Sequence, residues 1–257
     1  MGRPFSTFLL ALLATACLAG CSGPEEKPAA QAPAASPAAP AVPVSGDRLV
    51  TGTIGEPSNL IPMLATDSSS HEVGSLLYVS CLKYDKDLKL VPYAADFEVL
   101  EGGKLLRFTL KPGIRWWDGQ ELTARDVEFT YRLMVDPKTP TPYSGHYLLV
   151  SEASAPDPYT FRVRYERPFA PALDSWSLTQ LPAHLLEGRD VRESPLNRHP
   201  VGTGPYRFLR WDPGAQVVVA ANPDYFEGRP HLDRVVYRVI PDMATLFLEL
   251  SAGGIDQ

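Results

Sequence analysis

Short apolar runs along the chain predict a set of β-strands. Residues 48–55, R-L-V-T-G-T-I-G, and residues 104–110, K-L-L-R-F-T-L, each have the length and composition of a strand with a buried side. Residues 149–165 hold two strand patterns on either side of Pro-Asp-Pro, which predicts a hairpin. Further strands are expected at 207–211, 216–220 and 234–240.

Apolar residues at helical spacing predict the helices between these strands. The spacing from Val127 to Met134 predicts an amphipathic helix over 124–135. Thr123 and Asp126 stand at its start in the arrangement of a capping box, in which each side chain faces the other's backbone N–H. Further helices are expected at 68–82, where serines would cap the first turn, in the passage 170–187, and at 243–250. This mixture of strands and helices over residues 47–257 indicates an α/β or α+β body.

The first 20 residues have the pattern of an export signal. An apolar run from Phe8 to Ala19 is too short to cross a membrane as a helix. It leads into L-A-G-C, which resembles a bacterial lipobox, so Cys21 is expected to be lipidated and to become the mature N-terminus. An ordinary signal peptide with an incidental cysteine is the alternative. The rest of 21–46 is rich in alanine and proline and is expected to be an extended linker.

Charge and cysteine content exclude several functions. The formal net charge is −6 and no basic run is present, so nucleic acid is not an expected partner. Of the three cysteines, one falls in the signal and one in the lipobox, which leaves Cys81 as an expected buried apolar residue. The five histidines are scattered without metal-ligand spacing. Neither a metal nor a cofactor is therefore expected.

The segment H-P-V-G-T-G-P-Y, residues 199–206, contains two glycines that could suggest a phosphate-binding loop. A dinucleotide loop needs a third glycine and a following helix, but Arg207 stands at the third glycine position and a strand pattern follows. We therefore interpret Gly202 and Gly204 as scaffold, with glycine permitting unusual backbone angles before a strand.

No catalytic constellation is visible in the sequence. The nucleophile-elbow motif is absent, and acidic residues are numerous without any pair that stands out. The Trp116-Trp117 pair is different, because alternation would place one indole in the core and the other outward, where it could meet a ligand. We include Trp117 among the candidate ligand contacts and assign no catalytic residue.

Five segments, read together, resemble solute-binding protein family 5, the oligopeptide- and dipeptide-binding lipoproteins of ABC importers. The segment G-I-R-W-W-D-G-Q-E-L-T-A-R-D-V-E-F-T-Y at 113–131 is similar to a signature of that family. The other matches are E-P-S-N-L-I-P at 56–62, P-V-G-T-G-P-Y-R-F at 200–208, N-P-D-Y-F-E-G-R-P-H-L-D-R-V at 222–235 and G-G-I-D at 253–256.

The resemblance implies a periplasmic-binding-protein-like fold of type II. Residues 47–257 would correspond to the N-terminal part of the binding domain, that is, the first lobe with an extra subdomain at about 75–175. In the family the G-x-x-D segment lies near the middle of the chain, so the second lobe would be absent from this sequence. The acidic residue that pairs with a peptide's α-amino group in relatives would also lie outside it.

The resemblance also implies where a peptide would touch the chain. Relatives use the loop after the first strand, which here is Thr66, Asp67 and Ser68, and the tyrosine that ends V-D-P-K-T-P-T-P-Y, which is Tyr143. A tyrosine offers an apolar ring and a hydroxyl, while an extended peptide is held mostly through its backbone. Helix capping is the alternative role for Thr66 and Ser68.

The function implied is capture of oligo- or dipeptides without chemistry, followed by delivery to an ABC permease and its ATPase. The protein would sit in the periplasm or at the cell surface, anchored to the membrane through its lipid. The same scaffold could bind another solute, such as a nickel chelate, an opine or an oligosaccharide. A lipid-anchored hydrolase is the alternative from another class.

Overall fold

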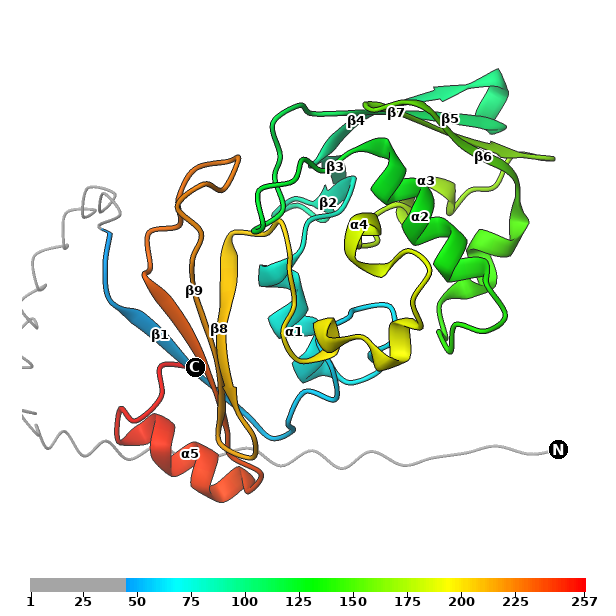
Figure 1. Ribbon diagram of the computed structural model, residues 1–257. Helices are drawn as coiled ribbons and strands as arrows, with labels where there is room; N and C mark the ends of the chain where they lie inside the picture. The colour runs from blue at the N-terminus through cyan, green and yellow to red at the C-terminus, as the bar shows by residue number, and fades with distance from the viewer. Residues whose placement is uncertain (1–44) are drawn as a thin grey trace, which may run out of the picture. The chain divides into compact units, whose positions relative to one another are not determined.

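Strands from opposite ends of the chain form the first sheet of the computed structural model, which describes residues 45–257 (Figure 1). The strand order is β1-β10-β9-β8. β1 pairs parallel with β10, with Arg48 opposite Arg234, and the other two pairings are antiparallel. The strands span Arg48–Thr53 (β1), Tyr206–Asp212 (β8), Gln216–Ala221 (β9) and Arg234–Val239 (β10). All four were predicted from the sequence.

The middle of the chain builds a second sheet, antiparallel throughout, in the order β4-β5-β7-β6. The strands span Ala95–Leu100 (β4), Leu105–Leu110 (β5), Val150–Asp157 (β6) and Thr160–Tyr165 (β7). The predicted hairpin is therefore β6 and β7. A separate two-stranded ribbon pairs Leu82–Tyr84 (β2) with Leu90–Pro92 (β3). We did not predict β2, β3 or β4.

The helices lie against these sheets. Their spans are Ser68–Leu77 (α1), Ala124–Val135 (α2), Ala172–Ser175 (α3), Ala183–Leu186 (α4) and Met243–Ser251 (α5). Short 3-10 helices lie at Glu101–Gly103, Ser144–Leu149, Val191–Glu193 and Pro195–Asn197. Within residues 45–257, no helix is long and apolar enough to cross a membrane.

α2 has the predicted bounds because its first turn is fixed from both sides. The Thr123 backbone N–H donates to Asp126 Oδ2 at 2.8 Å, and the Ala183 N–H of α4 donates to Asp126 Oδ1 at 2.9 Å. Burial raises the pKa of the Asp126 carboxyl despite these hydrogen bonds. α2 packs against β6 and β7, so this one carboxyl joins the second sheet's helix to α4.

Two helix predictions were only partly right. The N-cap of α1 is Asp67 and not a serine, and α1 ends at Leu77, before the predicted end at 82. The chain after Leu77 is extended because Tyr78 leaves the helical region with φ −126° and ψ 157°. Within 170–187, two four-residue helices take the place of one longer passage.

The first sheet is covered on both faces. Val219, Val235 and Tyr237 point to the side of α1 and join the large core that continues into the second sheet. The opposite face, which we call the outer face, carries the small apolar cluster covered by Leu246 of α5: Val50, Val218, Val236, Ile240 and Ile255. Figure 1 shows α5, in red, on the side of this sheet away from α1.

The G-G-I-D segment follows α5 and lies along the edge of β1. The Val50 N–H donates to Asp256 Oδ2 at 2.8 Å, and the Gly52 N–H donates to the Gln257 carbonyl at 2.7 Å. A Cβ on Gly52 would stand 2.6 Å from Leu246 and 2.7 Å from Ile255. Gly52 therefore allows α5 and Ile255 to approach the sheet closely.

Three distant segments meet at Gly202, in a contact that we call the backbone junction. A Cβ on Gly202 would stand 1.8 Å from the Leu77 carbonyl oxygen, and the Gly204 N–H donates to that oxygen at 2.9 Å. The Trp117 N–H donates to the Gly202 carbonyl at 3.0 Å. The segment is scaffold, as predicted, but for another reason: neither glycine has a positive φ, and close backbone packing is what excludes a side chain.

We expect Gly202→Ala to lower the free energy of unfolding by about 3 kcal/mol, because the methyl group overlaps rigid backbone at the end of α1. Urea unfolding followed by circular dichroism measures the change. The matched control is Gly145→Ala, where a Cβ would meet nothing within 4 Å and φ is not positive. Equal destabilisation by both substitutions would contradict the packing argument.

Candidate functional site

Tyr143 lies against the loop that precedes α1. Its hydroxyl donates to the Ala65 carbonyl oxygen at 2.8 Å, across 78 positions of sequence. The loop residues Thr66 to Ser68 follow immediately. The structure therefore brings together four of the five residues that the sequence analysis named as ligand contacts.

His71 holds Tyr143 from the other side. Its Nε2 lies 2.9 Å from the Tyr143 hydroxyl oxygen, and the two rings meet edge to face with centroids 5.9 Å apart. Because the tyrosine proton is given to Ala65, the imidazole must be the donor, so the proton sits on Nε2. Sequence analysis did not identify His71 as part of the site. Its position in the first turn of the predicted helix, close in sequence to Thr66 and Ser68, could have indicated it.

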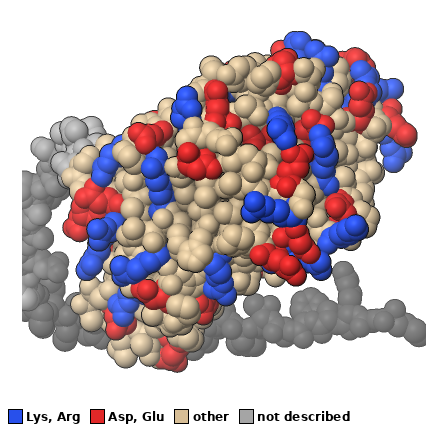
Figure 2. Space-filling view, viewed as in Figure 1, with Lys and Arg blue, Asp and Glu red and all other residues tan. Residues whose placement is uncertain are grey.

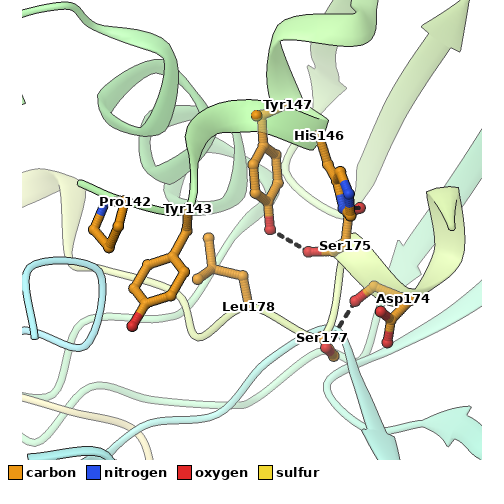
Figure 3. A pocket seen from close by; sticks show the side chains of 9 residues that line it. Pro142, Tyr143, His146, Tyr147, Asp174, Ser175, Ser177 and Leu178 are labelled. Atoms are coloured by element: carbon orange, nitrogen blue, oxygen red, sulfur yellow. Dashed lines mark hydrogen bonds between the residues drawn. The ribbon is translucent and has the colours of Figure 1, made fainter. Parts of the chain in front are cut away.

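Tyr143 also forms one wall of an open pocket of about 420 Å³ (Figure 3). The lining residues are Pro142, Tyr143, Gly145, His146, Tyr147, Asp174, Ser175, Ser177 and Leu178. In Figure 3 the Leu178 side chain lies between the Tyr143 and Tyr147 rings, and the Tyr143 hydroxyl points away from Ser175. The pocket is an aromatic and aliphatic cavity with hydroxyl and carboxylate groups at its edge, which is the usual composition of a small-molecule site.

The three loop residues have different environments. Asp67 caps α1: its carboxylate accepts hydrogen bonds from the Ser70 N–H at 2.7 Å and the Ser58 hydroxyl at 2.6 Å. Burial alone would raise the pKa of Asp67, but these bonds hold it below its usual value. Thr66 and Ser68 are exposed, and their side chains have no hydrogen-bond partner within the described part of the chain. The capping role belongs to Asp67, so Thr66 and Ser68 remain available to a ligand.

Trp117, the fifth candidate, lies elsewhere. It is half-buried against Gly202 at the last turn of α1, while Thr66 and Ser68 lie at the first turn. The length of α1 separates these places by about 14 Å. The Trp117 indole N–H is buried without a partner among residues 45–257. Trp116 is the core member of the pair, with 1% of its surface exposed.

The polar groups of the pocket do not assemble a hydrolase centre. Ser175 Oγ lies 3.4 Å from His146 Nδ1, but the Asp174 carboxylate accepts a hydrogen bond from the Tyr84 hydroxyl and forms neither a hydrogen bond nor an ion pair with His146. Cys81 is buried, and burial raises the pKa of its thiol to about 12, so it is not a nucleophile at neutral pH. No three His, Cys, Asp or Glu side chains in residues 45–257 are placed to hold a metal ion.

The sheets, their helices and the open pocket define a class. The architecture is that of the type II periplasmic binding proteins, of which the chain corresponds to part of a first lobe. A sequence model described as bacterial extracellular solute-binding proteins, family 5 Middle, matches residues 59–257. The chain therefore belongs to solute-binding protein family 5, whose members bind solutes for transport and are not enzymes.

Relatives and solved structures agree with this family. The chain is 35% identical to the oligopeptide-binding protein AppA of Bacillus subtilis over 223 residues, covering 83% of this chain and 41% of AppA. The structure of AppA in complex with a nonapeptide aligns with a TM-score of 0.78 at 34% identity, covering 83% of this chain and 44% of AppA. The chain thus spans about two fifths of the length of the curated relatives it matches.

Two other solved structures bind different solutes. DppA of Helicobacter pylori, in complex with the peptide STSA, aligns with a TM-score of 0.75 at 26% identity, over 82% of this chain and 46% of DppA. NikZ of Campylobacter jejuni, in complex with Ni(L-His), aligns with a TM-score of 0.76 at 25% identity, over 81% of this chain and 42% of NikZ. The shared fold accommodates more than one class of ligand.

We expect Asp67→Ala to lower the free energy of unfolding by about 1 kcal/mol at pH 7, because α1 loses its N-cap. Asp67→Asn, which keeps an acceptor oxygen, should cost less. The pKa is lower in the folded than in the unfolded state, so the stabilisation by Asp67 is complete above the ordinary value of 3.8 and is lost as the pH falls through the folded value. Urea unfolding at pH 7 and at about pH 3 tests this; an equal difference between wild type and Asp67→Ala at both pH values would contradict it.

Proposed function

We propose that this chain is the first-lobe part of a substrate-binding protein of an ABC-type importer, and that its substrate is an oligo- or dipeptide. The observation that carries the proposal is that Tyr143, which lines the 420 Å³ pocket, donates a hydrogen bond to Ala65, the residue directly before the Thr66–Ser68 loop. The peptide complexes of AppA and DppA support the same class of substrate.

The geometry suits an extended peptide. Tyr143 presents the face of its ring, while His71 and the Ala65 carbonyl fix the orientation of its hydroxyl. Thr66 and Ser68, both exposed, offer hydroxyls and backbone groups beside it. Such sites hold the ligand's main chain with polar groups and leave its side chains in undemanding pockets, which permits many sequences.

The further steps belong to the same proposal. A captured peptide would pass to the permease and ATPase of the importer when the protein docks on them. Lipidation at Cys21 and the linker over 21–46 would keep the binding protein in the periplasm or at the cell surface, attached to the membrane. Cys21, the signal 1–20 and the linker up to residue 44 lie outside the residues that the structure describes.

We expect Tyr143→Phe to weaken peptide binding about two- to tenfold, because the hydroxyl that joins Ala65 and His71 is lost. Tyr143→Ala should weaken it further, since the aromatic wall is lost as well. Calorimetry with a mixed peptide library on the purified chain measures the affinities.

The matched control is Tyr159→Phe, which removes a hydroxyl bonded to Glu121 on a part of the chain that does not line the pocket. Equal affinity losses at both tyrosines would contradict the assigned site. Binding of Ni(L-His), an opine or an oligosaccharide in the same assay, without peptide binding, would replace peptide by that solute.

We expect Cys21→Ala to release the protein from the membrane fraction, because two or more acyl chains are needed for stable anchoring and none could be attached. Fractionation of cells that produce each form gives the measurement. Retention of the variant in the membrane fraction, to the same extent as wild type, would show that Cys21 carries no anchor.

A further inference from the structure

The outer face of the first sheet carries a cluster of arginines beside α5. In β1 and β10, alternate side chains point to this face: Arg48 and Val50, then Arg234, Val236 and Arg238. The valines are covered by Leu246 of α5, but the arginines near the start of both strands are exposed. Basic and acidic side chains alternate over this part of the molecule, at the left of Figure 2.

These arginines surround a cavity of about 190 Å³. Arg48, Arg234 and Arg238 line it together with Arg210 of β8, Gln216 and Gly254. The cavity lies on the side of the sheet opposite α1 and shares no lining residue with the pocket at Tyr143. It is a separate site, and a ligand proposed for it does not depend on whether the chain binds peptides.

Only half of these positive charges are balanced. Arg238 donates to Glu249 and to the Gly254 carbonyl, each at 3.0 Å, and Arg210 donates to Asp212 at 2.9 Å. The nearby Asp233 carboxylate pairs with Arg229. Among residues 45–257, neither Arg48 nor Arg234 forms an ion pair, although Asp47 accepts a hydrogen bond from the Arg48 backbone N–H.

Arg48 and Arg234 are also direct cross-strand partners in the parallel register. Like charges placed opposite each other on one face destabilise a sheet. A ligand with two or more acidic oxygens would remove this repulsion and give each guanidinium a partner that fits its planar array of N–H donors.

We propose that this cavity binds a phosphate-class oxyanion between Arg48 and Arg234. Arg210 and Arg238 add to the positive electrostatic potential of the cavity. The group could arrive as free phosphate or as the headgroup of a phospholipid, because the recognised chemistry is the same in both. Either source is compatible with a protein of net charge −6, since the recognition is local to one sheet face.

The first experiment uses inorganic phosphate as the probe. Thermal unfolding of the purified chain is measured in about 10 mM phosphate and in chloride of equal ionic strength, and we expect phosphate to raise the Tm by about 2 °C or more. Arg48→Gln and Arg234→Gln should each weaken phosphate binding at least about tenfold, measured by calorimetry. Arg132→Gln removes the same charge from the exposed surface of α2 and should leave phosphate binding unchanged.

A second readout separates an anion site from ordinary structural arginines. Without phosphate, Arg48→Gln should unfold at the same temperature as wild type or higher, because repulsion from Arg234 is relieved. Arg48→Lys keeps the charge but lacks the planar array of donors, so it should retain part of the phosphate response. A lower Tm for Arg48→Gln without phosphate, with the phosphate response unchanged, would overturn the proposal.

Lipid vesicles distinguish the two possible sources of the phosphate group. Binding to phosphatidylglycerol vesicles that is stronger than binding to phosphatidylcholine vesicles, and that is lost in Arg48→Gln, would assign the site to a lipid headgroup. Binding of soluble phosphate without any such preference would assign it to a free oxyanion. No effect of phosphate on the Tm, or equal losses in Arg48→Gln and Arg132→Gln, would overturn the site.

Discussion

The backbone junction at Gly202 is the contact on which the arrangement of this chain depends. There the end of α1, the turn that holds Trp117 and the segment leading into β8 meet through main-chain atoms, with the Gly204 N–H on the Leu77 carbonyl and the Trp117 N–H on the Gly202 carbonyl. Side chains can adjust to one another, but backbone at these distances cannot. The junction therefore fixes α1 against the first sheet and joins both to the segment that follows the second sheet's β5.

The candidate binding site depends on that fixed helix. Its first turn carries Asp67, which shapes the loop, and His71, which orients Tyr143. Because one end of α1 is held by the junction and the other end carries the loop, the site is placed by a rigid element. Tyr143 comes from a connection after α2, so the site joins two parts of the chain that the sequence keeps far apart.

Sequence reasoning succeeded where the signal is local and failed where it depends on pairing. α2 could be predicted to the residue because its amphipathic spacing and its capping residues lie within one segment. β2, β3 and β4 are short or largely exposed, and their stability comes from partners that no local pattern specifies. The Tyr143 and Thr66–Ser68 region was predicted through family resemblance and stays a prediction. The contact of His71 with Tyr143 could not be predicted, because it depends on the rotation of α1 about its axis. The pairing of Arg48 with Arg234 could not be predicted either, because it depends on the register of two strands that are far apart in the sequence.

The parallel pairing of β1 with β10 has a consequence for how the chain folds. β1 is the first strand of the described chain, and its partner is the last. Until β1 and β10 meet, both edges of Arg48–Thr53 are open, and closing the long loop between these two strands is slow. The first sheet is thus assembled late, and folding intermediates of this protein should expose an unpaired amino-terminal strand while the β6–β7 hairpin and α2 are already formed.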